Sequence, residues 1–233
     1  MEQSGTSALL QGAVQDLASD VVSALRGGDH VRMSGTGAAM DDVEGSLALA
    51  AVRVLGADVL LPHVLFPTPP APEALAVFRK TAEAYPPRPD AAPTVTWSHR
   101  AMRRTLLRLG EPAPGDDGPE PDAAWLDAAS WQVLAHQLAV LAPLAVPGED
   151  DAVTRAARRR PVDLARGFVR AVRRRDWQQA AGAGRWLTVV DGVPDTLGLE
   201  AGLDFVELMG GGDPRVALQV QAARVLRAAG TTV

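Results

Sequence analysis

The chain has 233 residues, a net charge of −5 and no cysteine, and 47% of its residues are hydrophobic although only 4% are aromatic. The lack of cysteine excludes disulfide bonds and every cysteine-based metal or nucleophile site. Alanine, leucine and valine dominate the apolar residues, and this balance favours closely packed helices over sheets.

The sequence shows no strong membrane or export signal. The longest apolar stretch, Leu134–Val146, is interrupted by His136 and Pro143 and is shorter than the ~20 residues that a membrane span needs. The N-terminal residues lack the basic start and apolar run of a signal peptide. We therefore expect a cytoplasmic protein with no membrane partner. Lys80 is the only lysine, a bias typical of high-GC bacteria such as actinobacteria, so arginine runs carry less weight as a functional signal.

The first half of the chain predicts four helices. Apolar residues recur at three- and four-residue steps from Thr6 to Arg26, and two glycines follow. Further helices are expected from Asp42 to Gly56, from Pro72 onward and from Ser98 onward. An alternative interpretation of residues 30–66 is a small βαβ insert, with strands at 30–37 and 57–61 around the second helix.

The segment Glu111–Asp122 is the best candidate for a domain boundary. It carries 5 acidic residues and no basic one, and its prolines and glycines oppose both helix and strand. We predict an N-terminal helical domain over residues 1–110, a connector over 111–121, and a C-terminal domain of helix hairpins over 122–233.

The second half predicts one long helix followed by helix pairs. The long helix runs from Asp122 to about Val146 and is apolar on most of its circumference, which is typical of the central helix of a domain. The pairs join residues 162–174 with 176–190, and residues 195–209 with 213–229. Short turns favour stacked antiparallel hairpins. The fold class is therefore all-α, a helical bundle plus antiparallel helix hairpins with about eight or nine helices.

Three residues of the expected long helix form the candidate ligand-binding site. Trp125, Gln132 and His136 share one face of that helix, so a polar pair is expected in an apolar setting. Buried polar groups need partners, and a ligand can supply them. The competing and favoured explanation is that Gln132 and His136 bond each other and a nearby carbonyl group within the core.

Other motifs are weaker. The Gly35-Thr36-Gly37 loop lacks the remaining residues of a phosphate-binding motif. The acidic groups at 41–44 and 149–151 fit helix N-termini better than a magnesium site. No serine lies in a nucleophile context. We therefore assign no catalytic residue, no metal and no cofactor.

Two arginine runs, at 158–160 and 173–175, raise the possibility of nucleic-acid binding. The C-terminal half has a charge sum near zero, with acidic residues between the basic ones, so nucleic acid is the least favoured partner.

The leading functional hypothesis is a non-catalytic, helical accessory module that binds a protein or peptide partner in a groove between hairpins. The alternative is a small-molecule-binding protein or an enzyme of secondary metabolism. Its pocket would lie around Trp125, Gln132 and His136, with Arg166 or Arg170 at the mouth.

Overall fold

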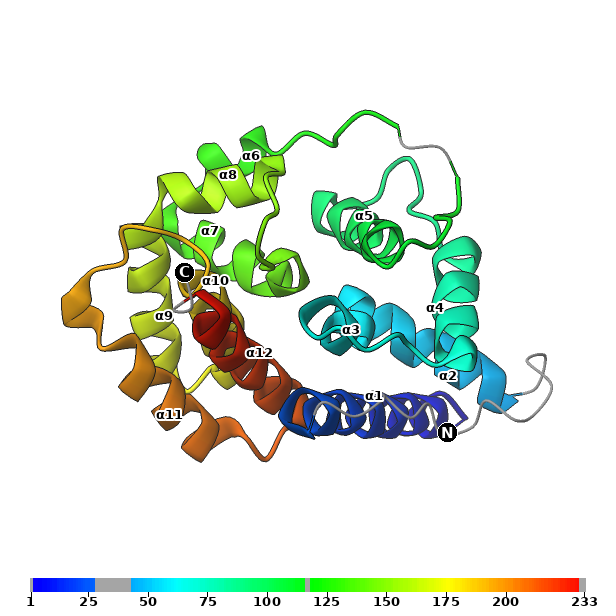
Figure 1. The fold of residues 1–233 in the computed structure, drawn as a ribbon. Helices are drawn as coiled ribbons and strands as arrows, with labels where there is room; N and C mark the ends of the chain where they lie inside the picture. Colours follow the sequence, from blue (N-terminus) through cyan, green and yellow to red (C-terminus); the bar gives the residue numbers. More distant parts are fainter. Residues whose placement is uncertain (1, 28–42, 116–117, 231–233) are drawn as a thin grey trace. The chain divides into compact units, whose positions relative to one another are not determined.

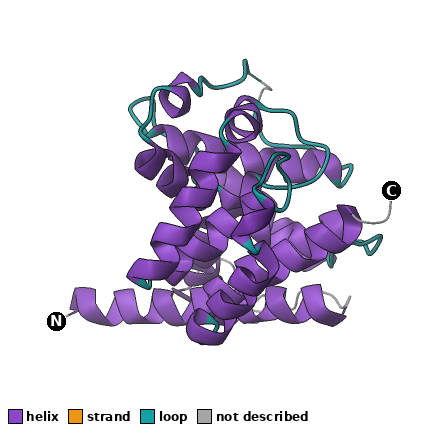
Figure 2. Ribbon diagram, turned by 90° about the vertical axis from the view of Figure 1, so that its left-hand side faces the viewer, coloured by secondary structure: helices purple, strands orange, loops and turns teal. Residues whose placement is uncertain are grey.

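The computed structural model describes residues 2–27, 43–115 and 118–230, and its regular structure there is entirely helical (Figure 2). The first half contains α1 (Glu2–Gly27), α2 (Val43–Leu55), the 3₁₀ helix η1 (Gly56–Leu60), α3 (Leu61–Leu65), α4 (Pro72–Ala84) and α5 (Pro93–Arg108). The second half contains α6 (Ala124–Asp127), α7 (Trp131–Val140), η2 (Ala142–Leu144), α8 (Ala152–Arg159), α9 (Pro161–Arg174), α10 (Trp177–Leu187), η3 (Asp195–Leu197), α11 (Leu199–Gly210) and α12 (Pro214–Gly230).

The all-α prediction is confirmed for these residues, whereas the expected number of eight or nine helices is too low. The difference comes from short elements such as α3 and α6, which are too brief to show a helical period in the sequence.

The chain divides into two units. The N-terminal unit comprises Met1–Ala91 with Ser98–Asp117, and the C-terminal unit comprises Ala92–Trp97 with Gly118–Val233. The helix α5 thus contributes its first turn to the C-terminal unit and the rest to the N-terminal unit. That the two halves are independent domains joined by a connector stays a prediction.

The N-terminal unit is built on α2, which packs against α1 and α4 (Figure 1). Each of these helices, and α5, contributes fully buried apolar side chains to the unit's core, among them Val21, Val52, Phe78, Met102 and Leu106. Their spacing follows the amphipathic periods from which the helices were predicted.

The expected second strand at 57–61 is wrong. These residues form η1 and the start of α3, and all of them are buried. Gly56, with a φ of +60°, ends α2 in a left-handed conformation that suits glycine. A short, continuous apolar run is equally compatible with a buried strand and a buried helical turn, which explains the error. The expected first strand and the Gly35–Gly37 loop lie outside the described residues.

One segment of the N-terminal unit, Gly45–Leu65, is long and apolar enough by length and composition to cross a membrane. It is longer than Leu134–Val146, on which the membrane prediction was based. However, 67% of its most apolar 18-residue window is buried within the structure. The buried core helix of a globular protein can also meet these criteria of length and composition. Gly56 divides it into shorter helical pieces.

The C-terminal unit is organised around α10, which packs against α7, α9, α11 and α12 (Figure 1). Every residue from Ala180 to Leu187 is buried. The expectation that residues 122–146 form the central helix, with the hairpins around it, is therefore wrong, because the central place is taken by α10, a member of the first expected pair. The sequence of α10 concealed its role, because alanine and glycine make it less apolar than a typical core helix.

Glycine is required where α10 and α9 approach α7. A Cβ atom added at Gly182 would lie 2.6 Å from the carbonyl oxygen of Ala139, and one added at Gly167 would overlap the Cβ of Ala135. Real Cβ atoms do not approach other atoms this closely, so the helices would have to separate. The small residues thus set the interhelical distances of the unit.

Overpacking typically costs about 1–3 kcal/mol, whereas the change from glycine to alanine gains ~1 kcal/mol in helix propensity. We therefore expect Gly182→Ala to destabilise the C-terminal unit by up to about 2 kcal/mol, because the added Cβ meets backbone atoms of Ala139. The melting temperature should fall by roughly 2–4 °C for each kcal/mol. The matched control is Gly12→Ala on α1, where an added Cβ meets nothing within 4 Å. Thermal unfolding followed by circular dichroism measures both, and an unchanged or raised melting temperature for Gly182→Ala would contradict the packing argument.

Candidate functional site

The three predicted site residues lie on two helices rather than one. The expected long helix is interrupted after α6, and Ser130 begins α7 by accepting a hydrogen bond at its side-chain oxygen from the Val133 amide, at 3.4 Å. Trp125 is on α6, whereas Gln132 and His136 are on α7. The shared face on which the site prediction depended therefore does not exist.

The expected burial of Gln132 and His136 is also wrong, because both side chains are exposed. His136 Nδ1 lies 3.3 Å from Oε1 of Gln179 on α10, so its polar partner is not Gln132. Trp125 is half-buried and donates its indole N–H to the Asp122 carbonyl oxygen at 3.2 Å. Ligand binding by these three residues stays a prediction.

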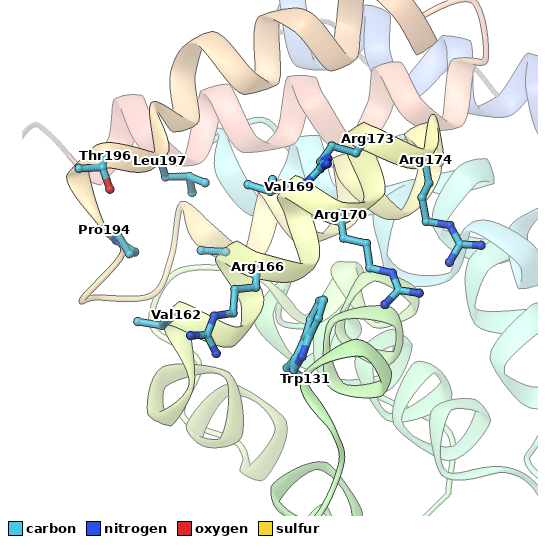
Figure 3. A pocket seen from close by; sticks show the side chains of 11 residues that line it. Trp131, Val162, Arg166, Val169, Arg170, Arg173, Arg174, Pro194, Thr196 and Leu197 are labelled. Carbon is cyan, nitrogen blue, oxygen red and sulfur yellow. The ribbon is translucent and has the colours of Figure 1, made fainter.

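A groove of about 670 Å³ lies instead on the outer face of α9 (Figure 3). We call it the α9 groove. It is lined by Trp131 of α7, by Val162, Ala165, Arg166, Val169, Arg170, Arg173 and Arg174 of α9, and by Pro194, Thr196 and Leu197 at η3. Figure 3 shows Trp131 and Leu197 on either side of α9. None of Trp125, Gln132 and His136 lines it, whereas both arginines expected at a pocket mouth, Arg166 and Arg170, do.

The apolar part of the groove is open to solvent. Val162 and Val169 expose 46% and 43% of their surface, although valine is usually among the buried residues. The opposite face of α9 carries Leu164, Phe168 and Ala171, which are buried in the unit. Two apolar stripes therefore run along α9, of which packing within the unit covers one.

The four arginines of the groove differ in the contacts that their guanidinium groups make. Arg166 forms an ion pair with Asp163 at 3.4 Å. The guanidinium of Arg170 lies 5.6 Å from the centre of the Trp131 ring, a cation–π contact. The side chains of Arg173 and Arg174 form no ion pair or hydrogen bond with the residues that the structure describes. The C-terminal end of α9 therefore carries two guanidinium groups whose positive charge no ion pair balances.

The other arginine run behaves differently, because each of its members has an acidic partner. Arg158 pairs with Asp150 at 3.0 Å and Arg160 with Asp163 at 2.7 Å, and Arg159 pairs with Asp127. Arg160 also donates to the carbonyl oxygens of Leu126 and Ala129. These arginines tie α8 and the start of α9 to the segment around α6.

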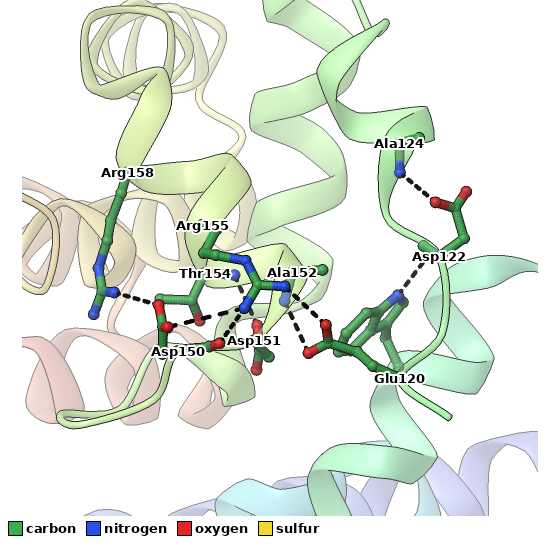
Figure 4. Close-up of polar contacts among 10 residues, drawn as sticks. Glu120, Asp122, Ala124, Asp150, Asp151, Ala152, Thr154, Arg155 and Arg158 are labelled. Carbon is green, nitrogen blue, oxygen red and sulfur yellow. Dashed lines mark hydrogen bonds and ion pairs between the residues drawn. The ribbon is translucent and has the colours of Figure 1, made fainter. Parts of the chain in front are cut away.

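The acidic group at 149–151 has a structural role (Figure 4). Asp151 caps α8 by accepting the Thr154 amide at 2.8 Å. Arg155 donates to Glu120 at 2.8 Å, and the second oxygen of Glu120 accepts the Ala152 amide at 3.1 Å. Among residues 2–27, 43–115 and 118–230, no three histidine or carboxylate side chains are placed to hold a metal ion. Asp41 and Asp42 lie outside the described residues.

The α9 groove could have been found from the spacing of residues 162, 166, 169 and 173. These positions fall on one helical face and alternate valine with arginine. In the sequence, Arg173 stands out as part of the run 173–175. Its position on the same helical face as Val162 and Val169 is less conspicuous and was not predicted.

Comparison with protein-family models, with curated proteins and with solved structures gives no match for this chain. The functional argument therefore depends on the groove itself.

His99, in the N-terminal unit, is half-buried, and its Nε2–H donates to the Ala82 carbonyl oxygen at 2.9 Å. Burial lowers the pKa of His99 below its usual value. The hydrogen bond to Ala82 raises this pKa, while the positive charges of Arg53 and Arg103 lower it further. The folded protein consequently binds this proton less readily than the unfolded chain does.

We expect the stability of the protein to decline as the pH falls through about 6.5, where the unfolded chain protonates His99 first. The loss stops growing once the pH is below the lowered pKa of the folded state. Comparing the melting temperature of His99→Gln with that of the unaltered protein between pH 7.5 and 5.5 isolates this contribution. The same change at the exposed His136 is the control, and a pH-independent difference for His99→Gln would refute the assignment.

Proposed function

We propose that this chain is a non-catalytic binding module that holds a segment of a protein or peptide partner in the α9 groove. The observation that carries the proposal is the outer face of α9, where two exposed valines alternate with arginines along the helix. Exposed apolar residues that line up along a groove are typical of binding surfaces rather than of a solvated helix face.

The composition of the groove supports binding rather than catalysis. Its lining residues include no histidine, carboxylate, cysteine or serine, which are the groups that most enzymes use for proton transfer or nucleophilic attack. Arginine stays protonated near neutral pH and serves mainly to recognise anionic groups.

The dimensions support a polypeptide ligand. The lining positions of α9 run from Val162 to Arg174, which corresponds to about 18 Å of helix. A face of that length accommodates about three turns of a helix or five to six residues of extended chain. A drug-sized ligand would instead be largely enclosed, and the exposure of Val162 and Val169 argues against enclosure.

The area of such a groove supports weak and reversible association rather than a permanent complex. Complete burial of a valine side chain is worth about 1.5 kcal/mol, and exposed arginine–carboxylate pairs add ~0.2–1 kcal/mol each. Two valines and a few arginine pairs together supply only a few kcal/mol, which corresponds to affinity near the millimolar range unless the ligand makes further contacts.

A cytoplasmic location, a high-GC bacterial source and the absence of a membrane partner are further predictions from the sequence.

Selection of random 12-residue peptides on phage against the full chain tests the proposal. We expect sequences to be enriched that bind the unaltered protein and lose at least tenfold in affinity to Val169→Asp, because the charge replaces an apolar contact. Isothermal titration calorimetry of synthetic copies measures the affinities.

The matched control is Val140→Asp on α7, where the valine exposes 52% of its surface outside the groove. It should leave binding unchanged. If no peptide is enriched, or if both variants bind equally well, the α9 groove is not a peptide site.

A further inference from the structure

Building on the proposed function, we propose that the α9 groove selects an acidic, amphipathic segment and holds it in one orientation. Its carboxylates lie at the Arg173–Arg174 end of the groove, and its apolar residues lie at the Val162 end.

Charge complementarity identifies the acidic end. Along α9 the arginines lose their partners in order: Arg166 pairs with Asp163, Arg170 stacks on Trp131, and Arg173 and Arg174 have no polar partner within the described residues. An unneutralised pair of adjacent guanidinium groups is best matched by carboxylates, which arginine binds in a fork geometry.

The helix itself does not account for both charges. The C-terminus of α9 carries a partial charge of about −0.5, which favours a basic residue there. The two arginines leave an excess of roughly +1.5 after this term. Arg175 and Asp176, which connect α9 to α10, cancel each other in formal charge.

The other end of the groove is apolar and bordered by acids. Val162, Ala165, Pro194 and Leu197 line it. Two acidic residues lie next to these lining residues in the sequence. Asp163 of α9 forms ion pairs with Arg160 and Arg166, and Asp195 of η3 is exposed between the lining residues Pro194 and Thr196. A carboxylate of the ligand gains little here, whereas an apolar side chain covers Val162. The two ends therefore favour different chemistry, which sets the orientation of the ligand.

An acidic peptide fits this surface better than a nucleic acid. Arg170 lies over one face of the Trp131 ring and therefore competes there with a stacking base. The run Arg158–Arg160 is neutralised by its own acidic partners and does not extend the basic surface. The exposed valines have no counterpart in a phosphate backbone.

The test uses the peptide selection described above, repeated on Arg173→Gln/Arg174→Gln. Peptides selected on the unaltered protein should be enriched in Asp and Glu relative to the starting library, clustered at one end of each sequence. Replacing those carboxylates by amides should weaken binding about tenfold, and raising the salt from 50 to 500 mM should remove most of this difference. On the double variant the enrichment should vanish.

The control is Arg158→Gln/Arg159→Gln, which removes the same charge from paired arginines on α8 and should leave the selected sequences acidic. A nitroxide placed on the acidic end of a selected peptide should broaden the amide signal of Arg174, and one on the apolar end that of Val162.

The outcomes separate the two proposals. Groove-bound peptides without acidic enrichment, or an equal response to both double variants, would overturn the charge inference and leave the binding module intact. A spin label that broadens the opposite end of α9 would overturn the orientation. Tighter binding of a 12-nucleotide single strand than of any selected peptide would overturn the inference in favour of nucleic acid. If no peptide is enriched at all, both proposals fail together.

Discussion

The close approach of helices around α10 is the constraint on which the C-terminal unit depends. Four helices pack against this one element, and such crowding is possible only because the stretch Ala180–Gly184 consists of alanine and glycine alone. The short distance between backbones fixes where α7 and α9 lie. It therefore also fixes where Trp131 and the outer face of α9 are presented to solvent. The groove is a consequence of how tightly its supporting helices pack.

Directly after these small residues, α10 carries two large polar side chains in the same core. Arg185 is fully buried and donates to the Ala145 carbonyl oxygen at 3.2 Å and to Gln219 Oε1 at 2.9 Å. Trp186 donates its indole N–H to the Leu138 carbonyl oxygen at 2.7 Å. Buried polar groups are tolerated when hydrogen bonds replace those lost to water. Here the bonds reach the residue that follows η2, as well as α7 and α12. They therefore fix the register of helices whose small residues alone would let them slide.

Helices that show an apolar period could be predicted from the sequence, whereas helix breaks and the choice of the central helix, which depend on tertiary packing, could not. Five helices, α1, α2, α4, α5 and α9, were predictable because each carries an apolar stripe at helical spacing. The break between α6 and α7 was not, because Ala128 and Ala129 favour helix and only the cap at Ser130 marks the new start. The site at Trp125, Gln132 and His136 assumed an unbroken helix, and the break removes the face that all three would have shared. Ligand binding by these residues stays a prediction.

The identity of the central helix was concealed for a related reason. A helix buried on all sides by close neighbours needs small residues, and small residues lower the apolar signal that identifies a core helix. The longer and more apolar stretch at residues 134–146 consequently looked central, although Val140 is exposed at its middle. Residue size, read together with apolar character, would have favoured α10.

The two arginine runs show why composition alone could not identify the surface available for binding. Both runs are three residues long, and each lies at the C-terminal end of a helix, the first at the end of α8 and the second at the end of α9. The acids that neutralise Arg158 and Arg159 come from a loop and from α6, so only the folded chain reveals them. Arg173 and Arg174 extend where the structure places no such acid. Adjacent like charges repel, and the fold gains little from keeping two of them at the end of α9. Their position beside exposed valines matches the acidic, amphipathic ligand proposed above, which would use both features, and the packing of α10 places both on the same face of α9.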